Sequence, residues 1–472
     1  MSEVKTGNNL FMSTPSNQQH ASTNEEPAEA CASAQPTRGG LLERFFKLSA
    51  HNTTVSTEVI AGITTFMTMV YIVFVNPQIL SAAGMDASAV FVVTCMISAI
   101  GCIAMGLIAN LPIALAPAMG LNAFFAFSVV VGMGVSWQIG MGTIFWGAVC
   151  FAIVSLLGIR SWILTNIPKC LRIGIPSGIG LLIAMVGFSN AGIVVASPAT
   201  MITVGDLSSL ECVLGALGFF IIVILASRGI HSAVLVSIAI VTAIAALMGD
   251  IEYTGIVSMP PSIANTFGEL DLAGSLDVAL MGVIFSFALV SLFDSSGTMI
   301  GVTEKCGFTD KRGRFPRMKQ ALMTDSATSV VGAYMGTSTV TAYIESSAGV
   351  AAGGRTGLTA IVAGLLFILV IFFSPLAAMV PGYAVAGALV YVGILMSSEL
   401  AKIDGKDLTE SAPAFITAVM MPFTFSITEG VAAGFITYCV LKAGTNRWRE
   451  IHPGVALVAL LFIFKFAFVD GH

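Results

Sequence analysis

Between residues 57 and 444 the sequence consists of apolar stretches separated by short polar segments. A stretch of about 20 apolar residues spans the hydrocarbon core of a bilayer as an α-helix. Lys, Arg, Asp and Glu make up only 10% of the chain, against about 25% in soluble domains, and they gather between the apolar stretches. The chain is therefore predicted to be an all-α polytopic membrane protein that has the lipid bilayer as a partner and binds no nucleic acid.

The apolar pattern predicts fourteen spans. They cover residues 57–80, 88–109, 112–133, 139–158, 173–192, 208–227, 231–249, 275–302, 317–335, 337–353, 357–379, 383–400, 411–427 and 429–444. Some of them, notably 337–353 and 429–444, are shorter than the roughly 20 residues that a straight transmembrane helix needs.

The positions of Lys and Arg test this count. Those between the predicted spans fall only in or beside alternate loops, and the intervening loops, including 193–207 and 250–274, have none. By the positive-inside rule the basic loops are cytoplasmic, so both the N-terminus and the end of the last span are predicted to be cytoplasmic. A single miscounted helix would break this pattern.

Fourteen spans divide into two sets of seven, and because seven is odd, a duplicated unit must be inverted in its second copy. Transporters often have such repeats, with discontinuous helices at corresponding positions. The third span, 112–133, begins PIALAPAMG, which disfavours a continuous helix, and the tenth, 337–353, begins with β-branched residues. A helical pattern then starts near Asn122 in the one and near Glu345 in the other. Two helix N-termini, with free N–H groups, are expected to meet near mid-membrane.

Few of the 26 acidic residues lie inside the predicted spans, and the clearest are Asp294, Asp325 and Glu345. A carboxylate at membrane depth is costly and by default marks a functional site. Asp294 and Glu345 are predicted to bind substrate and couple protons, since burial lets one carboxyl hold a proton while the other stays ionised. The alternative is that each bonds the backbone at a helix break. Asp325, among Ser and Thr residues, is predicted to be structural.

No other pattern indicates a reaction. The eight Cys residues have no paired spacing, the five His residues lie outside the spans, and no nucleophile–base pair stands out. The GGRTG segment at 353–357 lacks the Lys-Ser/Thr of a phosphate loop and is predicted to be a turn. The sequence therefore predicts a transporter rather than an enzyme, with no metal site and no cofactor apart from a co-transported proton.

The two ends of the chain differ from the spans. Residues 1–40 are polar and are predicted to form a disordered cytoplasmic tail. Residues 41–56, which begin LLERFFKL, are predicted to be an interfacial segment. Residues 446–472 contain the apolar stretch 453–469 with Lys465, which is predicted to be interfacial or partly inserted; a fifteenth span is the alternative.

The chain carries four long motifs: APAMGLNAFFAF at 116–127, LFDSSGTMIGVTEKCG at 292–307, GTSTVTAYIESSAGVAAGGRTGLTA at 336–360 and PAFITAVMMPFTFSITEG at 413–430. They resemble the AzgA-like purine permeases of the nucleobase–cation symporter-2 (nucleobase/ascorbate transporter) group, and within it the bacterial adenine permeases most of all. The resemblance runs from about Leu42 to the C-terminus.

This resemblance implies two inverted seven-span repeats in the cytoplasmic (inner) membrane. Residues 57–158 and 275–379 would form a core domain, and residues 159–250 and 380–445 a gate domain. Members of this group are often homodimers, so a homodimer is expected here.

The resemblance also implies a purine site between the third, eighth and tenth spans, with the two acids at Asp294 and Glu345. The expected substrate-binding residues are Asn122, Phe125, Asp294, Thr298, Ile344 and Glu345. Phe125 and Ile344 are expected to contribute their backbones.

The resemblance to guanine/hypoxanthine permeases is weaker, because these have Thr at the position of Asn122. An Asn amide can pair with the edge of adenine through two hydrogen bonds. The predicted function is therefore proton-coupled import of a purine nucleobase, adenine first, by alternating access of core against gate. A guanine/hypoxanthine permease is the alternative. An anion transporter of the same architecture is disfavoured, because Asp294 and Glu345 would repel its substrate.

Overall fold

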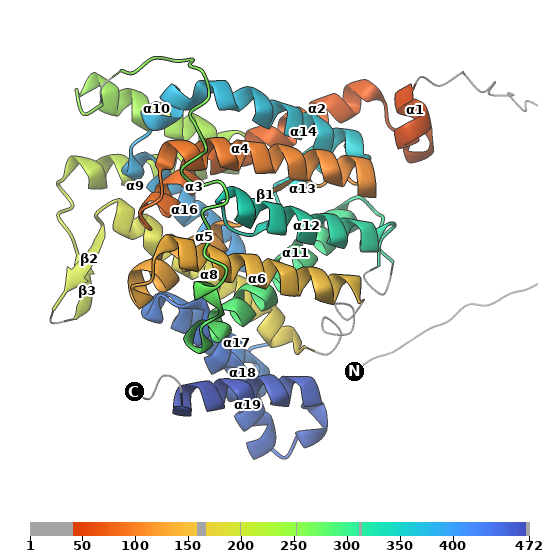
Figure 1. Cartoon of the computed structure of the whole chain (residues 1–472), viewed down its shortest axis with the longest axis vertical. Helices are drawn as coiled ribbons and strands as arrows, with labels where there is room; N and C mark the ends of the chain where they lie inside the picture. Colours follow the sequence, from red (N-terminus) through yellow and green to blue (C-terminus); the bar gives the residue numbers. More distant parts are fainter. Residues whose placement is uncertain (1–40, 158–166, 199, 252, 311–313, 469–472) are drawn as a thin grey trace, which may run out of the picture.

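The computed structural model describes residues 41–157, 167–198, 200–251, 253–310 and 314–468. Over these ranges the chain is mostly helical, and most long helices run across the view of Figure 1, roughly side by side. The segment 1–40, predicted to be a disordered tail, lies outside the described residues.

The longer helices form the body of the molecule. They are α2 (Val55–Met69), α3 (Ile72–Ser81), α4 (Ala87–Ala104), α6 (Trp137–Leu156), α8 (Lys169–Asn190), α9 (Leu210–Ser227), α10 (Ala233–Leu247), α11 (Met281–Lys305), α12 (Met318–Met335), α14 (Gly357–Val370), α16 (Gly382–Ser397), α17 (Leu408–Thr424), α18 (Ile427–Gly444) and α19 (Pro453–Phe468).

Short elements connect them. The short helices are α1 (Leu41–Phe46), α5 (Met119–Ala123), α13 (Ser346–Ala351) and α15 (Ser374–Ala378), with π-helical segments η2 (Met105–Ala109) and η3 (Phe124–Gly132). The 3-10 turns are η1 (Ser49–His51), η4 (Gly274–Leu276), η5 (Val278–Leu280), η6 (Ile371–Phe373), η7 (Ser398–Lys402) and η8 (Trp448–Glu450). The strands are β1 (Leu115–Pro117), β2 (Val194–Ser197), β3 (Met201–Val204) and β4 (Val340–Ala342).

Eight helical stretches of the described chain are long and apolar enough to cross a membrane, which makes this a multi-pass membrane protein. They are Val55–Ser81, Ala87–Ala109, Trp137–Leu156, Lys169–Asn190, Leu210–Ser227, Val278–Lys305, Gly357–Ala378 and Gly382–Lys402. Shorter apolar helices cover Met119–Gly132, Ala233–Leu247 and Pro453–Phe464. The count of fourteen spans stays a prediction.

Local sequence explains where several helices begin and end. The Ser136 hydroxyl caps α6 by accepting from the Ile139 N–H, and Ser209 caps α9 in the same way. α12 ends at Gly336, whose φ of 92° lies in the left-handed region. A Cβ there would lie 2.6 Å from backbone and side-chain atoms of Thr266, so only glycine fits this turn into β4.

The longer helices pack in two groups. The first contains α2, α4, α6, α11, α12 and α14, and the second contains α8, α9, α10, α16, α17 and α18. In Figure 1, α2, α4 and α14 lie near the top, whereas α17, α18 and α19 lie at the bottom. The groups meet where α5 and α11 contact α8 and where α3 contacts α16. The helix α19, in the segment predicted to be interfacial, packs against α18.

Two chain segments far apart in sequence, β1 and β4, form a two-stranded antiparallel sheet inside the first group of helices. The register places Leu115 opposite Ala342 and Pro117 opposite Val340. Proline restricts the preceding residue, Ala116, to extended conformations, and β-branched residues favour the extended conformation of β4. Each strand leads into a short helix, α5 after β1 and α13 after β4.

On each outer edge of this sheet, one side chain bonds both the N–H and the carbonyl of the first residue of the strand. The Cys102 thiol, on α4, contacts both the N–H and the carbonyl of Leu115, at 3.2 and 3.3 Å. The Ser329 hydroxyl, on α12, does the same for Val340, at 3.2 and 2.7 Å. Because a buried backbone group without a partner is costly, these two side chains allow an extended chain to lie in an apolar interior.

A second antiparallel pair, β2 and β3, corrects the prediction for residues 193–207, which were expected to form a loop. The hairpin forms because both strands are rich in β-branched residues, which favour an extended chain. The all-α description is therefore incomplete, although helices still make up most of the described chain.

Candidate functional site

The sheet formed by β1 and β4 brings the two predicted acids into one region. Glu345 lies three residues after Ala342, the last residue of β4, and directly before α13. Asp294 lies in the middle of α11, which packs against β4 and α13. The side chain of Thr341, in β4, hydrogen bonds to Asp294. Tyr343 lies close enough to Asp294 and to Glu345 to feel both charges. The structure thus places Asp294 and Glu345 around the end of one strand.

Glu345 accepts hydrogen bonds from two residues of the first predicted span, residues 57–80. The Tyr71 hydroxyl donates to Glu345 Oε1 at 2.8 Å, and the Thr68 hydroxyl lies 3.4 Å from the Glu345 carbonyl oxygen. Tyr391, on α16 of the second helix group, interacts electrostatically with Glu345. The hydrogen-bond partners of Glu345 thus come from the first helix group, and a residue of the second group lies within electrostatic range of it.

One face of α11 next to Asp294 is open. Asp294, Thr298 and Gly301 are partly accessible, and Gly297 is exposed. These residues follow the spacing of one helix face, and a Cβ built on Gly297 would meet no atom within 4 Å. Ile344 is also exposed, and its Cδ1 would lie 3.8 Å from a Cβ on Gly301. Asp294 and Glu345 are thus both partly accessible where α11 packs against the start of α13.

Asn122, in contrast, is completely buried and bonded inside the protein. The Asn122 amide N–H donates to the side-chain oxygen of Asn76. The Ser338 hydroxyl donates to the side-chain oxygen of Asn122. Asn76 also donates to Thr94 at 2.7 Å and to Thr337 at 3.1 Å. This network ties α3, α4 and α5 to the segment that leads into β4.

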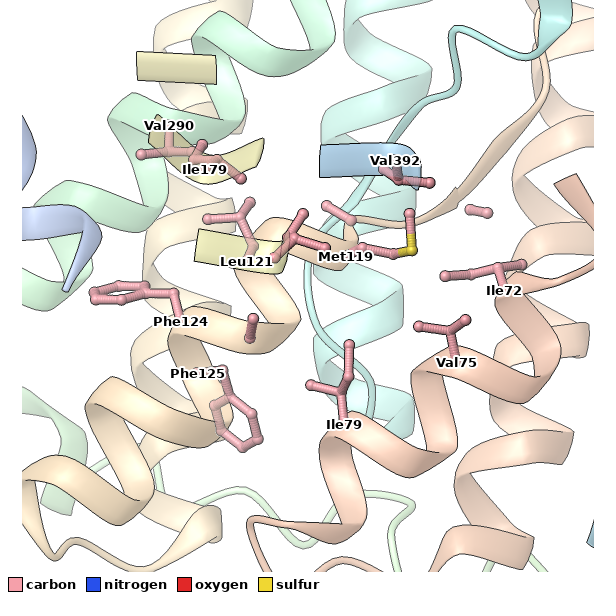
Figure 2. Close-up of a cluster of buried hydrophobic side chains, with 14 of the residues drawn as sticks. Ile72, Val75, Ile79, Met119, Leu121, Phe124, Phe125, Ile179, Val290 and Val392 are labelled. Atoms are coloured by element: carbon pink, nitrogen blue, oxygen red, sulfur yellow. The ribbon is translucent and has the colours of Figure 1, made fainter. Parts of the chain in front are cut away.

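The remaining predicted residue, Phe125, is also completely buried. A Cβ on Gly140 of α6 would lie 2.8 Å from its ring, so the Phe125 side chain packs closely against that helix. Figure 2 shows the apolar cluster around α5, with Ile179 of α8 and Val392 of α16 drawn beside Met119 and Leu121. The Phe125 side chain therefore belongs to the packed core, and its backbone is the part left to contact a ligand.

The sequence interpretation missed three residues that the structure brings to this region. Tyr71 donates a hydrogen bond to Glu345, and Tyr391 lies within electrostatic range of it, but a tyrosine inside an apolar stretch carries no signal of its own. Glu58 lies within the predicted span 57–80, and its carboxylate was the signal that was overlooked. It is completely buried and accepts from the Arg355 and Thr356 N–H groups, at 2.9 and 3.2 Å.

Those bonds hold the 353–357 segment, which was predicted to be a turn and connects α13 to α14. Asp325, predicted to be structural, is completely buried in α12.

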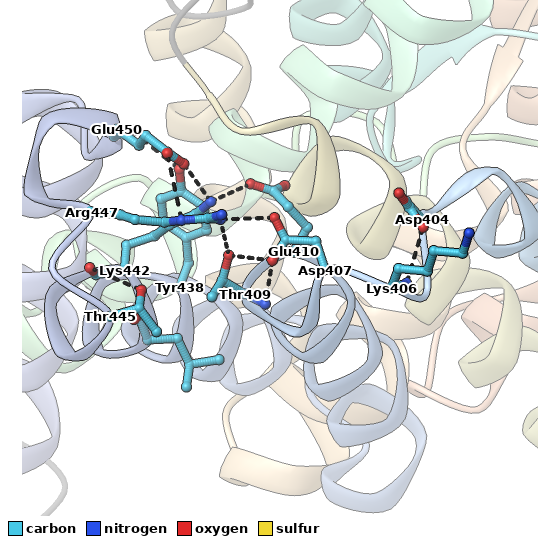
Figure 3. A network of polar contacts seen from close by, with 11 residues as sticks. Asp404, Lys406, Asp407, Thr409, Glu410, Tyr438, Lys442, Thr445, Arg447 and Glu450 are labelled. Carbon is cyan, nitrogen blue, oxygen red and sulfur yellow. Dashed lines mark hydrogen bonds and ion pairs between the residues drawn. The ribbon is translucent and has the colours of Figure 1, made fainter.

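A separate ionic network lies at the ends of α17 and α18 (Figure 3). The buried Lys442 ammonium contacts Glu410 at 2.9 Å and Glu450 at 2.6 Å. Arg447 pairs with Asp407 at 2.9 Å. Hydrogen bonds from Thr409 and from Arg447 lower the pKa of Asp407 to about 2. Because Lys442 and Arg447 pair with Asp407, Glu410 and Glu450, this network is a structural tie between two helices.

Within the described parts of the chain, no group of three or more His, Cys, Asp or Glu side chains is placed to hold a metal ion. The chemistry of the region around Glu345 is therefore that of two carboxyl groups, their phenol and hydroxyl partners, and backbone groups.

Comparison with known proteins defines the class. A family model described as a permease family (Xan_ur_permease) matches residues 56–433, so this chain belongs to that permease family. The match confirms that the protein is a transporter rather than an enzyme, and it confirms the family resemblance found in the sequence motifs.

The chain is 65% identical over 438 residues to the adenine permease AdeP of Escherichia coli, with 93% of this chain and 98% of AdeP covered. It is 61% identical over 431 residues to AdeQ, an adenine permease of the same organism, with 91% and 97% covered. It is 42% identical over 431 residues to the guanine/hypoxanthine permease PbuO of Bacillus subtilis, with 89% and 99% covered.

Among solved structures, the fold is similar to the transmembrane domain of the cyanobacterial bicarbonate transporter BicA. The TM-score is 0.61 at 16% identity, with 80% of this chain and 97% of that domain covered. Murine Slc26a9, an anion transporter in an inward-facing state, gives a TM-score of 0.59 at 11% identity, with 89% and 74% covered. At these identities the likeness concerns the fold alone.

Proposed function

We propose that this protein is a proton-coupled importer of a purine nucleobase, most of all adenine, in the cytoplasmic (inner) membrane. The observation that carries the proposal is the pair of partly accessible carboxyl groups, Asp294 and Glu345, at the end of β4 in a chain of this permease family. The names of AdeP and AdeQ, at 65% and 61% identity, support adenine as the substrate.

The proposed architecture has fourteen spans in two inverted repeats of seven, with discontinuous third and tenth spans. The antiparallel pairing of β1 with β4 supports it. So does the equivalence of Cys102 and Ser329, which lie in the predicted second and ninth spans and bond the first residue of each strand. The two groups of helices fit the core domain and the gate domain. We further propose a homodimer with cytoplasmic N-termini.

In the proposed site the purine lies where α11 packs against the start of α13, beside the partly accessible Asp294 and Glu345. Asp294 and Glu345 accept from purine N–H groups or, when protonated, donate to ring nitrogens. Thr298, one turn after Asp294, and the Ile344 backbone complete this side.

Asn122 and Phe125 form the opposite side of the proposed site. Because the Asn122 amide is bonded to Asn76 and Ser338, we assign it to holding the α5 backbone rather than to direct pairing with the purine.

The transport cycle follows from these positions. With the site open to the outside, Asp294 or Glu345 takes up a proton, and the purine binds next. Rocking of the first helix group against the second, across the contacts of α5 and α11 with α8, then opens the site to the cytoplasm. After the purine and the proton are released, the reverse rocking of the empty transporter opens the site to the outside again.

A guanine or hypoxanthine permease is the second candidate, supported by the 42% identity to PbuO. The fold likeness to BicA does not favour an anion, because the likeness shows the fold alone and two carboxylates would repel an anionic substrate.

Radiolabelled adenine uptake tests the proposal, in cells that lack their own purine permeases and with or without a protonophore. Uptake that the protonophore abolishes, and that unlabelled adenine competes better than guanine, hypoxanthine or uracil, is expected. Stronger competition by hypoxanthine or guanine would replace adenine by the second candidate. An absence of nucleobase uptake, with the protein present in the membrane, would overturn the proposal.

A further inference from the structure

The short helix α13 is bonded at both ends. Its partners lie in α2 and in the break between α2 and α3. At its start, Tyr71 donates to the Glu345 carboxylate, and beyond its end Glu58 accepts from the backbone of Arg355 and Thr356. Between these points, a Cβ on Gly349 would lie 2.0 Å from the Thr65 hydroxyl, so the two helices are in close contact.

Tyr71 owes its position to a break in the first apolar stretch. The helix α2 ends at Met69 and α3 begins at Ile72, so Tyr71 lies between two helices. Its side chain is 2% exposed, and its hydroxyl reaches Glu345 Oε1 at 2.8 Å.

Four titratable groups lie within electrostatic range of Glu345, and they come from four different parts of the chain. They are Tyr71 from the α2–α3 break, Asp294 from α11, Tyr391 from α16 and Tyr343 from the end of β4. The Tyr343 hydroxyl is used elsewhere, since it donates to the Pro117 carbonyl at 2.5 Å.

Among the described residues, Tyr71 is thus the one whose side chain donates a hydrogen bond to the Glu345 carboxylate. A phenol in this position donates best to an ionised carboxylate, and a hydrogen bond to a charged group is stronger than one between neutral groups.

We propose that Tyr71 is a positioning residue for Glu345, which it holds in place and whose proton release it assists through this hydrogen bond. The inference rests on the proposed proton-coupled function. Tyr71 keeps its own proton throughout: when Glu345 loses its proton, the phenol hydroxyl donates to the resulting carboxylate. When Glu345 is protonated, this donation weakens, and Glu345 is freer to turn toward the ligand.

The test is the pH profile of radiolabelled adenine uptake in the Tyr71→Phe variant, normalised to the amount of protein in the membrane. Removal of the donor favours the protonated form of Glu345. The alkaline limb of the profile is therefore expected to move to higher pH, by about one to two units. Uptake at acidic pH is expected to fall, because proton release becomes harder.

The matched control is Tyr383→Phe, which removes a buried phenol that donates to Asp250 at 2.5 Å, away from this site. Its profile is expected to match that of the unaltered protein. A Tyr71→Phe profile that is only scaled down, with the same pH dependence, would overturn the role of Tyr71. If adenine uptake by the unaltered protein depended neither on pH nor on the protonophore, the proposed function itself would be overturned.

If Tyr71→Phe is poorly inserted, adenine binding to the small purified amount is measured against pH. The same upward shift is expected there, and an unchanged pH dependence of binding would also overturn the role of Tyr71.

Discussion

The two strand–helix units of this protein, β1 with α5 and β4 with α13, have the same backbone plan and different chemistry. The first carries no charged residue, and its Asn122 is bonded on both sides inside the protein. The second carries Glu345, which is partly accessible and bonded to Tyr71. The polar side chain of the first unit is completely buried, whereas the carboxyl of the second is partly accessible.

This difference indicates a division of labour between two similar units. An extended strand inside a membrane protein needs side chains to satisfy its backbone, and Cys102 and Ser329 meet that need in both units. A carboxyl at membrane depth is costly and is found in one unit, where it is partly accessible and accepts a hydrogen bond from Tyr71. The first unit instead packs against α8 of the second helix group.

The largest expected effect is on the charged unit. Glu345→Gln keeps the shape of the side chain but removes its charge and its ability to exchange a proton. Adenine uptake is expected to fall by roughly 10- to 100-fold, since hydrogen bonds to charged groups contribute about 1.5–3 kcal/mol. Asp294→Asn is expected to have a similar effect.

Glu304→Gln is the control, because this residue is exposed near the end of α11, and its uptake is expected to be unchanged. Undiminished uptake in both Glu345→Gln and Asp294→Asn would remove the carboxyl pair from the mechanism.

Glycine substitutions in the two short helices sharpen the comparison. A Cβ on Gly349 would lie 2.0 Å from the Thr65 hydroxyl and 2.7 Å from the Ala61 backbone oxygen, so Gly349→Ala must push α13 away from α2. A Cβ on Gly120 would lie 2.0 Å from the Ile179 side chain, which can shift more easily than backbone.

Gly349→Ala is expected to destabilise the protein by about 1–3 kcal/mol, as overpacking does. Gly120→Ala is expected to destabilise it less and to slow uptake, because Ile179 belongs to the second helix group. Thermal unfolding of the purified proteins in detergent, together with uptake, measures both. If Gly120→Ala were the less stable variant, the contact of α13 with α2 would not be the tighter of the two.

Substitution of Asn122 tests whether its side chain stabilises the first strand–helix unit or contacts the purine. Asn122→Ala leaves buried groups of Asn76 and Ser338 without this partner, which costs about 1–3 kcal/mol. A lower Tm is expected, with the same ranking of adenine, hypoxanthine and guanine as competitors for the remaining uptake. A changed ranking would show that Asn122 contacts the purine directly, as the sequence interpretation had it.

The smallest effects are expected at the strand edges. Ser329→Ala removes a hydroxyl that exchanges two hydrogen bonds with Val340, and a loss of about 1–2 kcal/mol is expected. Cys102→Ala removes a weaker thiol donor and acceptor from Leu115, so a smaller loss is expected. Equal losses of Tm in the two variants would mean that the edges do not depend on side-chain donors in this way.

Much of the architecture was readable from the sequence, because hydrophobic length and charge placement report directly on a bilayer. The apolar stretches predicted a multi-pass membrane protein, and the motifs around Asn122, Asp294 and Glu345 pointed to the permease family to which the chain belongs. Asp294 and Glu345 could be singled out because a carboxyl among apolar residues is rare.

Other features depended on contacts that a one-dimensional pattern does not encode. The register of β1 against β4 joins residues more than 200 positions apart, and the partners Tyr71 and Tyr391 reach Glu345 from helices elsewhere in the chain. Whether Asn122 faces a ligand or a neighbouring amide is likewise decided by packing.

The sequence by itself thus determined the class of protein and the residues that carry charge, because the free energy of placing a side chain in a membrane depends on its type. The tertiary structure alone decided which strand–helix unit has a completely buried polar side chain and which has a partly accessible carboxyl. Hydrogen bonds and close contacts act over a few ångströms, and only the folded chain brings their partners together.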